Sequence, residues 1–223
     1  LVLSSTCAIY GVPSRIPIRE DEPKAPINPY GAAKLMAERL LEDYDRAYGL
    51  RHAALRYFNA AGADPEAEIG ECRREETHLV PLAIDAALGR RPRLTLFGTD
   101  YPTPDGTAVR DYVHVGDLAQ AHIRALDRLL AGSASFQVNL GTGRGYSVRE
   151  VIDAVAVEAG TEVPHDLAGR RAGDPPYLVA DPAAAAEILG KGIFPASSLA
   201  SIIRTAVRWH RASPDPVSPR EGG

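Results

Sequence analysis

Tyr30 and Lys34 are the residues whose types and spacing most directly suggest chemistry. They stand four positions apart in a segment of helical periodicity, so the phenol and the ammonium lie on one face of a helix. A free tyrosine, with a pKa near 10, is a poor base at neutral pH, but a cation about 4 Å away is worth roughly 4 kcal/mol at intermediate dielectric. Such a tyrosine can remove a proton from a sugar hydroxyl while a bound cofactor takes the hydride. The same spacing also occurs by chance on helices, so the pair needs support from other residues.

A strand that ends in hydroxyl side chains precedes this helix. Leu1 to Leu3 is typical of a buried strand, and Ser4, Ser5 and Thr6 follow it. In a parallel sheet, the end of a strand and the start of the next helix can meet at one edge. We therefore expect a hydroxyl here to bond to the same group that Tyr30 deprotonates.

Several motifs stand in a fixed order along the chain. Ser4-Ser5-Thr6 is followed by Tyr10-Gly11, by Pro29-Tyr30 with Lys34, and by Arg56-Tyr57-Phe58-Asn59. These motifs resemble the extended short-chain dehydrogenase/reductase superfamily. The later runs Gly106–Ala119, Asn139–Gly143 and Arg170–Asp174 resemble its nucleotide-sugar branch, the NAD-dependent epimerase/dehydratase family, and within it the UDP-hexose 4-epimerases. The resemblance covers nearly the whole chain.

The residues after Thr6 distinguish the reactions of this superfamily. Sugar-nucleotide dehydratases resemble one another in a Thr-Asp-Glu at this place, and decarboxylases carry a Glu, whereas Cys7 and Ala8 stand here. With no acid to protonate a leaving hydroxyl, the chemistry should stop at oxidation and reduction at C4. The resemblance therefore implies interconversion of UDP-glucose and UDP-galactose.

The resemblance also implies roles around the reacting carbon. Tyr30 as phenolate takes the C4 hydroxyl proton, NAD accepts the C4 hydride, and the hydride returns to the other face after the 4-keto sugar has turned. Thr6 hydrogen-bonds or shuttles the proton, and Lys34 stabilises the phenolate and contacts the nicotinamide ribose. The expected catalytic residues are Tyr30, Lys34 and Thr6, and the expected NAD contacts are Ser4, Thr6, Tyr30, Lys34 and Phe58.

Substrate recognition must hold a negatively charged diphosphate. Arg110 and Arg171 suit it because a guanidinium binds phosphate oxygens through two N–H groups, although a lone arginine is more often part of a surface ion pair. A helix beginning near position 77 would favour the anion, with donors from Asn59 and from the amides near His78, where some relatives have Asn, and Leu79. The resemblance implies further substrate contacts at Thr6 and Tyr30, at Thr95, Leu96 and Phe97 along the uracil, at Tyr112, and at Asp174 on the ribose.

The composition is that of an ordinary globular protein and excludes several classes. Its 223 residues include 25 Lys and Arg against 29 Asp and Glu, and the net charge of −4 recruits neither nucleic acid nor an anionic lipid surface. No apolar run approaches the roughly 20 residues of a membrane span. Neither disulfides nor a metal site are expected, because ligand spacing is missing around Cys7, Cys72, His52, His114, His122, His165 and His210. We expect a cytoplasmic protein without a membrane or nucleic-acid partner.

Short apolar runs alternate with helical segments, which is typical of α/β proteins. The runs are Ala53–Phe58, Leu94–Phe97, Tyr112–Val115 and Phe136–Leu140. The clearest helix has Asn28 as N-cap, Pro29 at its first position and Gly49 at its end. Its apolar stripe is expected to face the core and comprises Ala33, Ala37, Leu40, Leu41, Tyr44 and Tyr48. Other helices are expected over Thr77–Leu88, after Asp117 as N-cap, over Ser147–Ala159 and over Ser198–Arg211.

The expected fold is α/β, the C-terminal part of a Rossmann-type parallel sheet with a smaller mixed α/β substrate-binding domain. We expect residues 1–60 in the NAD-binding domain and 61–213 mainly in the sugar-nucleotide domain, with 106–140 returning in part to the Rossmann sheet and 214–223 as a flexible tail. The missing initiator Met and GxxGxxG phosphate loop suggest an N-terminally truncated chain. Gly141, Gly143 and Gly145 do not supply that loop, since Tyr146 stands where its frame needs glycine. They are expected in a tight turn near the sugar nucleotide.

Two alternatives remain open. Another NAD-dependent nucleotide-sugar epimerase, acting on N-acetylated or uronic substrates, would carry the same motifs, because the C2 pocket depends on loop packing. The second alternative is a truncated chain that binds a UDP-sugar without turnover, since the cofactor loop is missing. The resemblance also implies a homodimer, with the helix from Pro29 to Tyr48 forming part of the contact.

Overall fold

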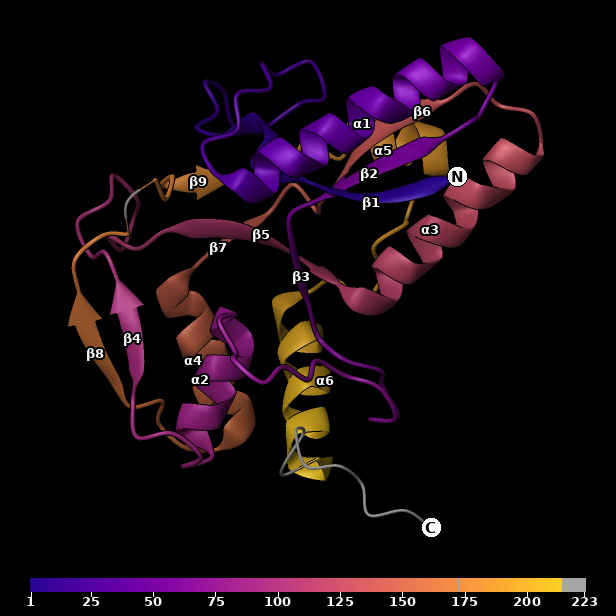
Figure 1. Ribbon diagram of the computed structural model, residues 1–223. Helices are drawn as coiled ribbons and strands as arrows, with labels where there is room; N and C mark the ends of the chain where they lie inside the picture. Colours follow the sequence, from indigo (N-terminus) through magenta and orange to yellow (C-terminus); the bar gives the residue numbers. More distant parts are fainter. Residues whose placement is uncertain (172, 214–223) are drawn as a thin grey trace.

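The computed structural model describes residues 1–171 and 173–213 and contains a three-stranded parallel sheet (Figure 1). Its strands lie in the order β1-β2-β6 and are β1 (Val2–Thr6), β2 (Ala53–Tyr57) and β6 (Phe136–Leu140). Residues 53–55 are fully buried, as in most parallel sheets, because helices cover both faces. Thr6 pairs in register with Tyr57, so β1 and β2 end at the same edge.

Helices lie on the two faces of this sheet. On one face, α1 (Pro29–Tyr48) packs on β1 and on the short 3-10 helix η1 (Cys7–Tyr10) that follows it. On the other face, α3 (Val115–Leu130) and α5 (Ala183–Leu189) share a hydrophobic core with side chains of β2 and β6. The end of β1 therefore lies beside the start of α1, where Tyr30 stands.

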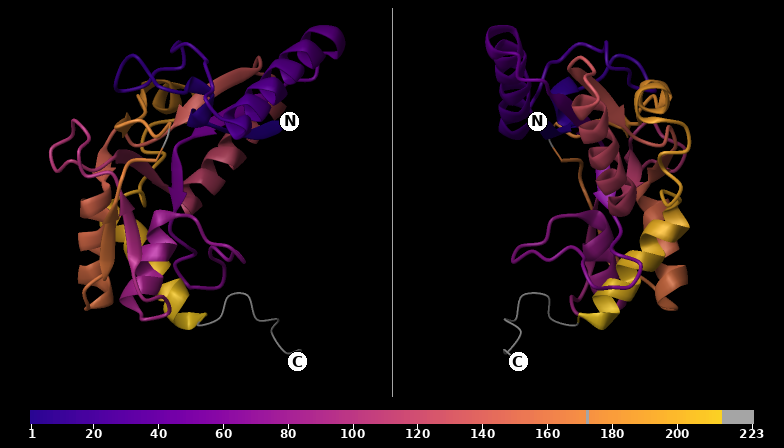
Figure 2. Two further views of the ribbon diagram at one scale, coloured as in Figure 1. Left: turned by 60° about the vertical axis from the view of Figure 1, so that its left-hand side comes forward. Right: turned by 90° about the vertical axis from the view of Figure 1, so that its right-hand side faces the viewer.

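A second group of elements lies below this sheet in Figures 1 and 2. Its central strand, β5 (Val109–His114), pairs with β3 (Asn59–Ala61), β7 (Gly145–Ser147) and β9 (Tyr177–Leu178). A parallel pair, β4 (Leu94–Phe97) and β8 (His165–Ala168), stands at one side. Three helices complete a separate core and are α2 (Leu79–Ala87), α4 (Val148–Ala159) and α6 (Leu199–Ala212).

The expected ends of α1 are confirmed, but the expected orientation of its apolar stripe is wrong. Asn28 accepts a hydrogen bond from the Gly31 amide, and Gly49 closes the helix in the left-handed conformation. The residues that α1 buries are Gly31, Leu35 and Glu38. The predicted stripe faces outward, and its Leu40, Tyr44 and Tyr48 side chains are 56%, 45% and 78% exposed. A buried carboxylate and a glycine thus occupy the side that packs on the sheet.

The other helices differ from expectation mainly at their beginnings. α4 and α6 follow Ser147 and Ser198 as expected, and Ser147 forms a capping box with Glu150. α2 begins at Leu79, not at position 77. The N-cap of α3 is His114, whose Nδ1 accepts from the Gly116 amide, so Asp117 is not the cap. This also ends β5 at His114, one residue before the expected strand end.

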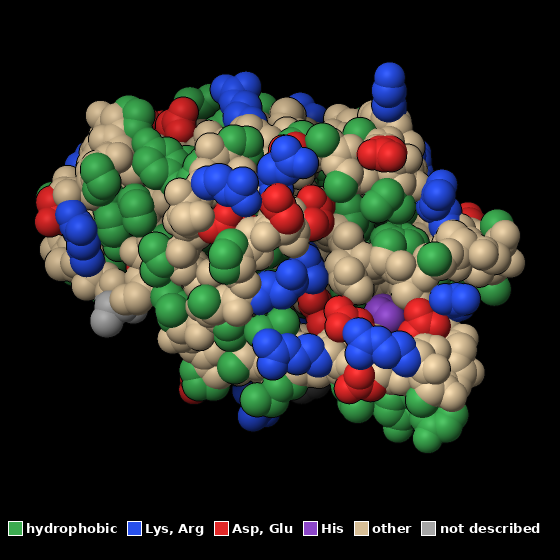
Figure 3. Space-filling view, turned by 90° about the horizontal axis from the view of Figure 1, so that it is seen from above, with side chains coloured by type: hydrophobic (Ala, Val, Ile, Leu, Met, Phe, Trp, Pro, Cys, Tyr) green, Lys and Arg blue, Asp and Glu red, His purple; other side chains and the backbone are tan. Residues whose placement is uncertain are grey.

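The expected α/β class with a partly Rossmann-type sheet is confirmed, whereas the division into domains stays a prediction. Within 106–140, β6 pairs with β2 in the parallel sheet, while β5 lies in the second group. Residues 214–223 lie outside the described part of the chain. None of the described helices is long and apolar enough to cross a membrane. On the face seen in Figure 3, Lys and Arg side chains lie among Asp and Glu side chains.

Candidate active site

A cavity of about 680 Å³ opens at the ends of β1 and β2, between the sheet and the second group of elements. Its size lies within the range of small-ligand sites. The cavity brings together almost all of the residues expected to bind or act. Among its lining residues are Thr6, Tyr30, Phe58, Asn59, His78, Leu79, Thr95, Leu96, Phe97, Arg110, Tyr112, Arg171 and Asp174. Of the expected residues, only Ser4 and Lys34 do not line it.

Thr6 is held at the cavity wall by the turn that follows it. It is the N-cap of η1, and its Oγ1 accepts a hydrogen bond from the Ala8 amide at 3.2 Å. The side chain is 6% exposed and borders the cavity. Because the oxygen already accepts from the backbone, its own O–H is left to donate. Thr6 is therefore suited to donate a hydrogen bond to a bound hydroxyl.

Tyr30 and Lys34 lie on the same face of α1, as their spacing predicts. The Lys34 Nζ is 5.8 Å from the centroid of the Tyr30 ring, within the range of a cation–π contact. Lys34 also donates to the Ser4 carbonyl oxygen at 2.9 Å, which fixes the ammonium against β1. The Ser4 hydroxyl instead bonds with His122 of α3, so Ser4 contributes to this site through its backbone. Tyr30 is 55% exposed at the cavity.

Gly31 allows α1 to approach η1 closely. A Cβ at this position would lie 2.4 Å from the Ala8 carbonyl oxygen, well inside van der Waals contact. The clash is with backbone, which cannot rotate aside as a side chain can. This close approach sets the distance between Tyr30 on α1 and Thr6 at the start of η1.

Gly31→Ala is accordingly expected to push α1 away from η1. We expect a cost of about 1–3 kcal/mol, as for overpacked sites, together with loss of activity because the two site residues separate. The free energy of unfolding, measured with urea, checks the first effect. Ala32→Gly, on the same turn of α1, is the control for backbone entropy, and equal stability of Gly31→Ala and the parent chain would contradict the prediction.

Two cationic side chains, Arg110 and Arg171, also line the cavity. Arg110 of β5 forms an ion pair with Asp174 and also donates to the Pro175 carbonyl oxygen at 2.8 Å. The Arg171 guanidinium lies 4.0 Å from the centroid of the Phe97 ring. Asp174 and Phe97 thereby orient the two arginines that are expected to bind phosphate. Burial raises the pKa of Tyr112 beside them to about 12.

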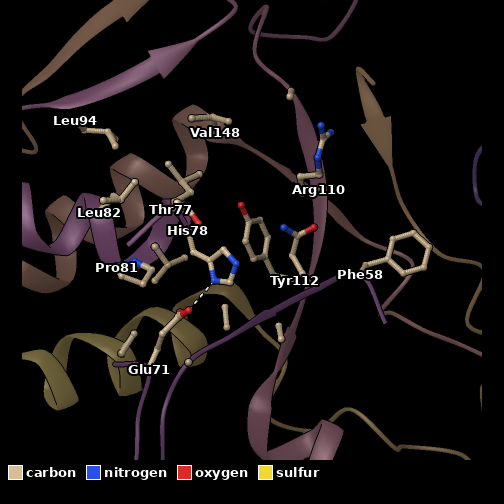
Figure 4. A pocket seen from close by; sticks show the side chains of 18 of the residues that line it. Phe58, Glu71, Thr77, His78, Pro81, Leu82, Leu94, Arg110, Tyr112 and Val148 are labelled. Atoms are coloured by element: carbon tan, nitrogen blue, oxygen red, sulfur yellow. Dashed lines mark hydrogen bonds and ion pairs between the residues drawn. The ribbon is translucent and has the colours of Figure 1, made fainter. Parts of the chain in front are cut away.

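His78 and Glu71 face each other in this part of the cavity, as Figure 4 shows. His78 Nδ1 lies 2.6 Å from a Glu71 carboxylate oxygen, and this hydrogen bond raises the pKa of His78. The His78 backbone amide, which was expected to be a donor to phosphate, is already bonded to the Glu76 carboxylate at 2.7 Å. At this residue the side chain is therefore the donor that is left for a ligand. The sequence analysis missed Glu71, which stands in a long loop without periodicity.

Glu71, Glu76 and His78 also bring ligand-type atoms within 4.8 Å of one another. Their polar groups are engaged within the chain, since Glu71 binds His78 and Arg73, and Glu76 accepts the Thr77 and His78 amides. These bonds account for the cluster without an ion, and we assign no metal to it.

The glycine-rich run after β6 forms a closed turn. Asp111 accepts hydrogen bonds from the Thr142 and Gly143 amides at 2.9 and 3.0 Å, and Gly143 has a positive φ of 77°. These amides therefore point at a carboxylate of the chain and not at a ligand. The turn is tight, as expected, but its residues are not among those that line the cavity.

A Rossmann-type sheet with Thr6, Tyr30 and Lys34 at its edge defines a class of nucleotide-dependent α/β proteins. A model of the NAD dependent epimerase/dehydratase family matches residues 1–141, and the chain belongs to this family. This confirms the family expected from the sequence.

The relatives it resembles are longer proteins. The chain is 52% identical over 212 residues to the UDP-glucose 4-epimerase of Azospirillum brasilense, an alignment that covers 95% of this chain and 61% of the relative. The structure resembles that of UDP-glucose 4-epimerase from Brucella ovis in complex with NAD, with 55% identity and a TM-score of 0.90, covering 93% and 64% of the two chains. It also resembles the Bifidobacterium longum enzyme in complex with NAD+ and UDP, with 35% identity, a TM-score of 0.88 and coverage of 96% and 64%. The chain thus spans less than two thirds of these relatives.

Proposed function

We propose that this chain carries the catalytic and sugar-nucleotide-binding residues of a UDP-glucose 4-epimerase, which interconverts UDP-glucose and UDP-galactose. One observation carries the proposal: Thr6 and Tyr30 meet the arginines and His78 in a single cavity. The chain is also about half identical to curated enzymes of this name. Cys7 supports epimerisation over dehydration, because burial raises the pKa of its thiol to about 12 and it offers no acid for elimination of water.

Each residue of the site has a task in this reaction. Tyr30 accepts the proton of the C4 hydroxyl and returns it at the end, with the Lys34 ammonium favouring the phenolate. Thr6 donates a hydrogen bond to the same oxygen and holds it beside Tyr30. Arg110 and Arg171 bind the diphosphate, which fixes the nucleotide while the hexose turns. The uracil and ribose contacts are assigned to Thr95, Leu96 and Phe97, and to Asp174.

NAD is the proposed cofactor, and it supplies reversible acceptance of the C4 hydride when bound. The residues at the sheet edge fit its nicotinamide end. Phe58 offers an apolar wall, and Lys34, fixed by the Ser4 carbonyl, presents an ammonium beside Tyr30 for hydroxyl groups of a ribose. The turn at Gly143 does not fit the cofactor's phosphates, because Asp111 occupies its amides.

Turnover of UDP-galactose to UDP-glucose in the presence of NAD tests the proposal. The chain is assayed alone and as a chimaera with the phosphate-loop half of the Azospirillum brasilense relative. Turnover by the chimaera supports the proposal, and turnover by the chain alone shows that it acts without that half. Conversion of a UDP-N-acetylhexosamine or UDP-glucuronate in preference would assign a different substrate, and no turnover in either form would contradict an epimerase.

A homodimer formed through α1 is part of this proposal. Leu40, Tyr44 and Tyr48 leave much of their apolar surface exposed on one side of the helix. Such a stripe is stabilised by burial against a second copy. The cytoplasmic location stays a prediction.

Leu40→Arg is expected to convert the dimer into a monomer, because a charge in the middle of an apolar contact is left unpaired on association. Sedimentation equilibrium measures the mass of the species. Ile69→Arg, at an exposed position of the loop after β3, is the control and should leave the mass unchanged. Dimers of unchanged stability in Leu40→Arg would exclude this face.

A further inference from the structure

Glu71 is fixed on the cavity wall through both its backbone carbonyl and its carboxylate. Its backbone carbonyl accepts from Trp209 Nε1 of α6 at 3.0 Å, and its carboxylate is 3.0 Å from Arg73 Nε. The side chain is 24% exposed. The loop after β3 therefore presents this carboxylate to His78 in a defined position.

The contact with Glu71 decides which way the imidazole faces. Nδ1 carries the proton, because a carboxylate can only accept, and the bond is 2.6 Å long. The other ring nitrogen, Nε2, points away from Glu71, toward the side on which Arg110 and Tyr112 lie (Figure 4). A protonated ring presents an N–H to an anion there, whereas a neutral ring presents a lone pair, which repels phosphate oxygens.

The charged groups around the pair come from several elements. Arg73 and Glu76 lie in the same loop, Arg110 and its partner Asp174 face the cavity from β5 and the segment before β9, and His210 of α6 lies 3.5 Å from Asp85. The hydrogen bond to Glu71 outweighs burial and raises the pKa of His78. Burial acts to raise the pKa of Glu71, but the hydrogen bond and charge of His78 outweigh it together with the charges of Arg73 and His210, so that this pKa is lowered.

We propose that Glu71 is a positioning residue that makes His78 a proton-dependent contact for the diphosphate of the nucleotide sugar. The proposal rests on the proposed function, since it assumes that a UDP-sugar fills the cavity. Its consequence is a sugar-nucleotide affinity that is high while His78 is protonated and falls as the pH rises through the pKa of His78, which Glu71 holds above 6.5.

Calorimetric titration of the full chain with UDP-glucose tests this inference. The dissociation constant is measured from about pH 5.5 to about pH 9, which spans the titration of histidine. UDP-glucose is chosen because each of its two phosphates carries one ester and one anhydride bond, which leaves only a strongly acidic group that stays ionised throughout this range. Each pH is repeated in buffers of different ionisation enthalpy, so that the number of protons taken up on binding is obtained as well.

Four variants separate the role of Glu71 from a structural one. We expect His78→Asn to remove the pH transition and Glu71→Gln to move its midpoint to lower pH. At the pH where the parent chain is protonated and Glu71→Gln is not, Glu71→Gln should bind about tenfold more weakly, the difference made by one charge-assisted hydrogen bond. Glu75→Gln removes an exposed charge from the same loop and should behave as the parent chain. His210→Gln should keep the transition, since His210 is paired with Asp85.

The outcomes are distinguishable. Proton uptake by the parent chain that is lost in His78→Asn, with a shifted midpoint in Glu71→Gln, supports the proposal. A midpoint unchanged in Glu71→Gln, or equal weakening at every pH, overturns it while leaving the epimerase assignment intact. Loss of the pH transition in His210→Gln overturns it as well, because the titrating group would then be His210. Absence of UDP-glucose binding at every pH contradicts the proposed function itself.

Discussion

Replacing Tyr30 with Phe is expected to lower the turnover of UDP-galactose by about 10²- to 10⁴-fold, the usual contribution of a positioned acid or base. Only the hydroxyl of the phenol is removed, and the ring that stands beside Lys34 is kept. Since Arg110 and Arg171 are untouched, the affinity for UDP should change little. The expected pattern is therefore a fall in kcat with a nearly constant KM.

The measurement is made in the NAD-loaded chimaera, in which turnover can be followed. Tyr48→Phe is a matched control, because it removes a phenolic hydroxyl from the same helix at a position that is 78% exposed and far along α1. Full activity in Tyr30→Phe would overturn the catalytic assignment. A fall in kcat with an equally large loss of UDP affinity would show that the phenol mainly holds the nucleotide.

Local patterns predicted the frame of this site well. The N-cap Asn28, the proline after it and the closing Gly49 depend only on nearby backbone bonds, and they locate α1 to the residue. The helix then places Tyr30 and Lys34 on one face because i and i+4 are neighbours. The order of the motifs predicted that residues as distant in the sequence as Thr6, Arg110 and Asp174 belong to one site, and all three line the cavity.

Long-range contacts explain what local patterns missed. Asp117 has the type of an N-cap, but it binds the Ala196 amide and the Ser197 hydroxyl, while His114 caps α3. The helical period of the outward stripe of α1 predicts that one side of the helix is apolar. It does not predict whether that side packs on the sheet. Glu71 lies in a loop, and only the folded chain brings it to His78.

The buried charges behind the site escaped the sequence analysis for the opposite reason, since acidic and basic residues are usually assigned to the surface. Glu38 of α1 and Arg56 of β2 are each 2% exposed and share a bidentate contact, with a shortest distance of 2.6 Å. Ser5 of β1 donates to the same carboxylate at 2.5 Å, and Arg56 reaches Tyr10 of η1 at 3.0 Å. This network joins α1, which carries Tyr30, to the strand that ends in Thr6.

Arg56→Met is consequently expected to destabilise the chain by about 3–5 kcal/mol, because it leaves the Glu38 carboxylate buried without its partner. For a chain of this length, that corresponds to a fall in Tm of about 6–20 °C. Combining Arg56→Met with Glu38→Leu removes both charges together, so the double variant should be more stable than Arg56→Met alone. Thermal unfolding and urea titration of the parent chain, the two single variants and the double variant give the coupling free energy between the two side chains.

Arg46→Met supplies the comparison, because Arg46 pairs with Glu42 and Asp43 on the same helix but is 74% exposed. Loss of a solvent-exposed pair costs about 0–1 kcal/mol, so its Tm should change by only a few degrees. Equal effects of Arg46→Met and Arg56→Met would mean that the buried pair contributes no more than a surface one. In that case the position of α1 would depend on the packing of Gly31 and Leu35 against its neighbours, and the network would not be needed to hold Tyr30 beside Thr6.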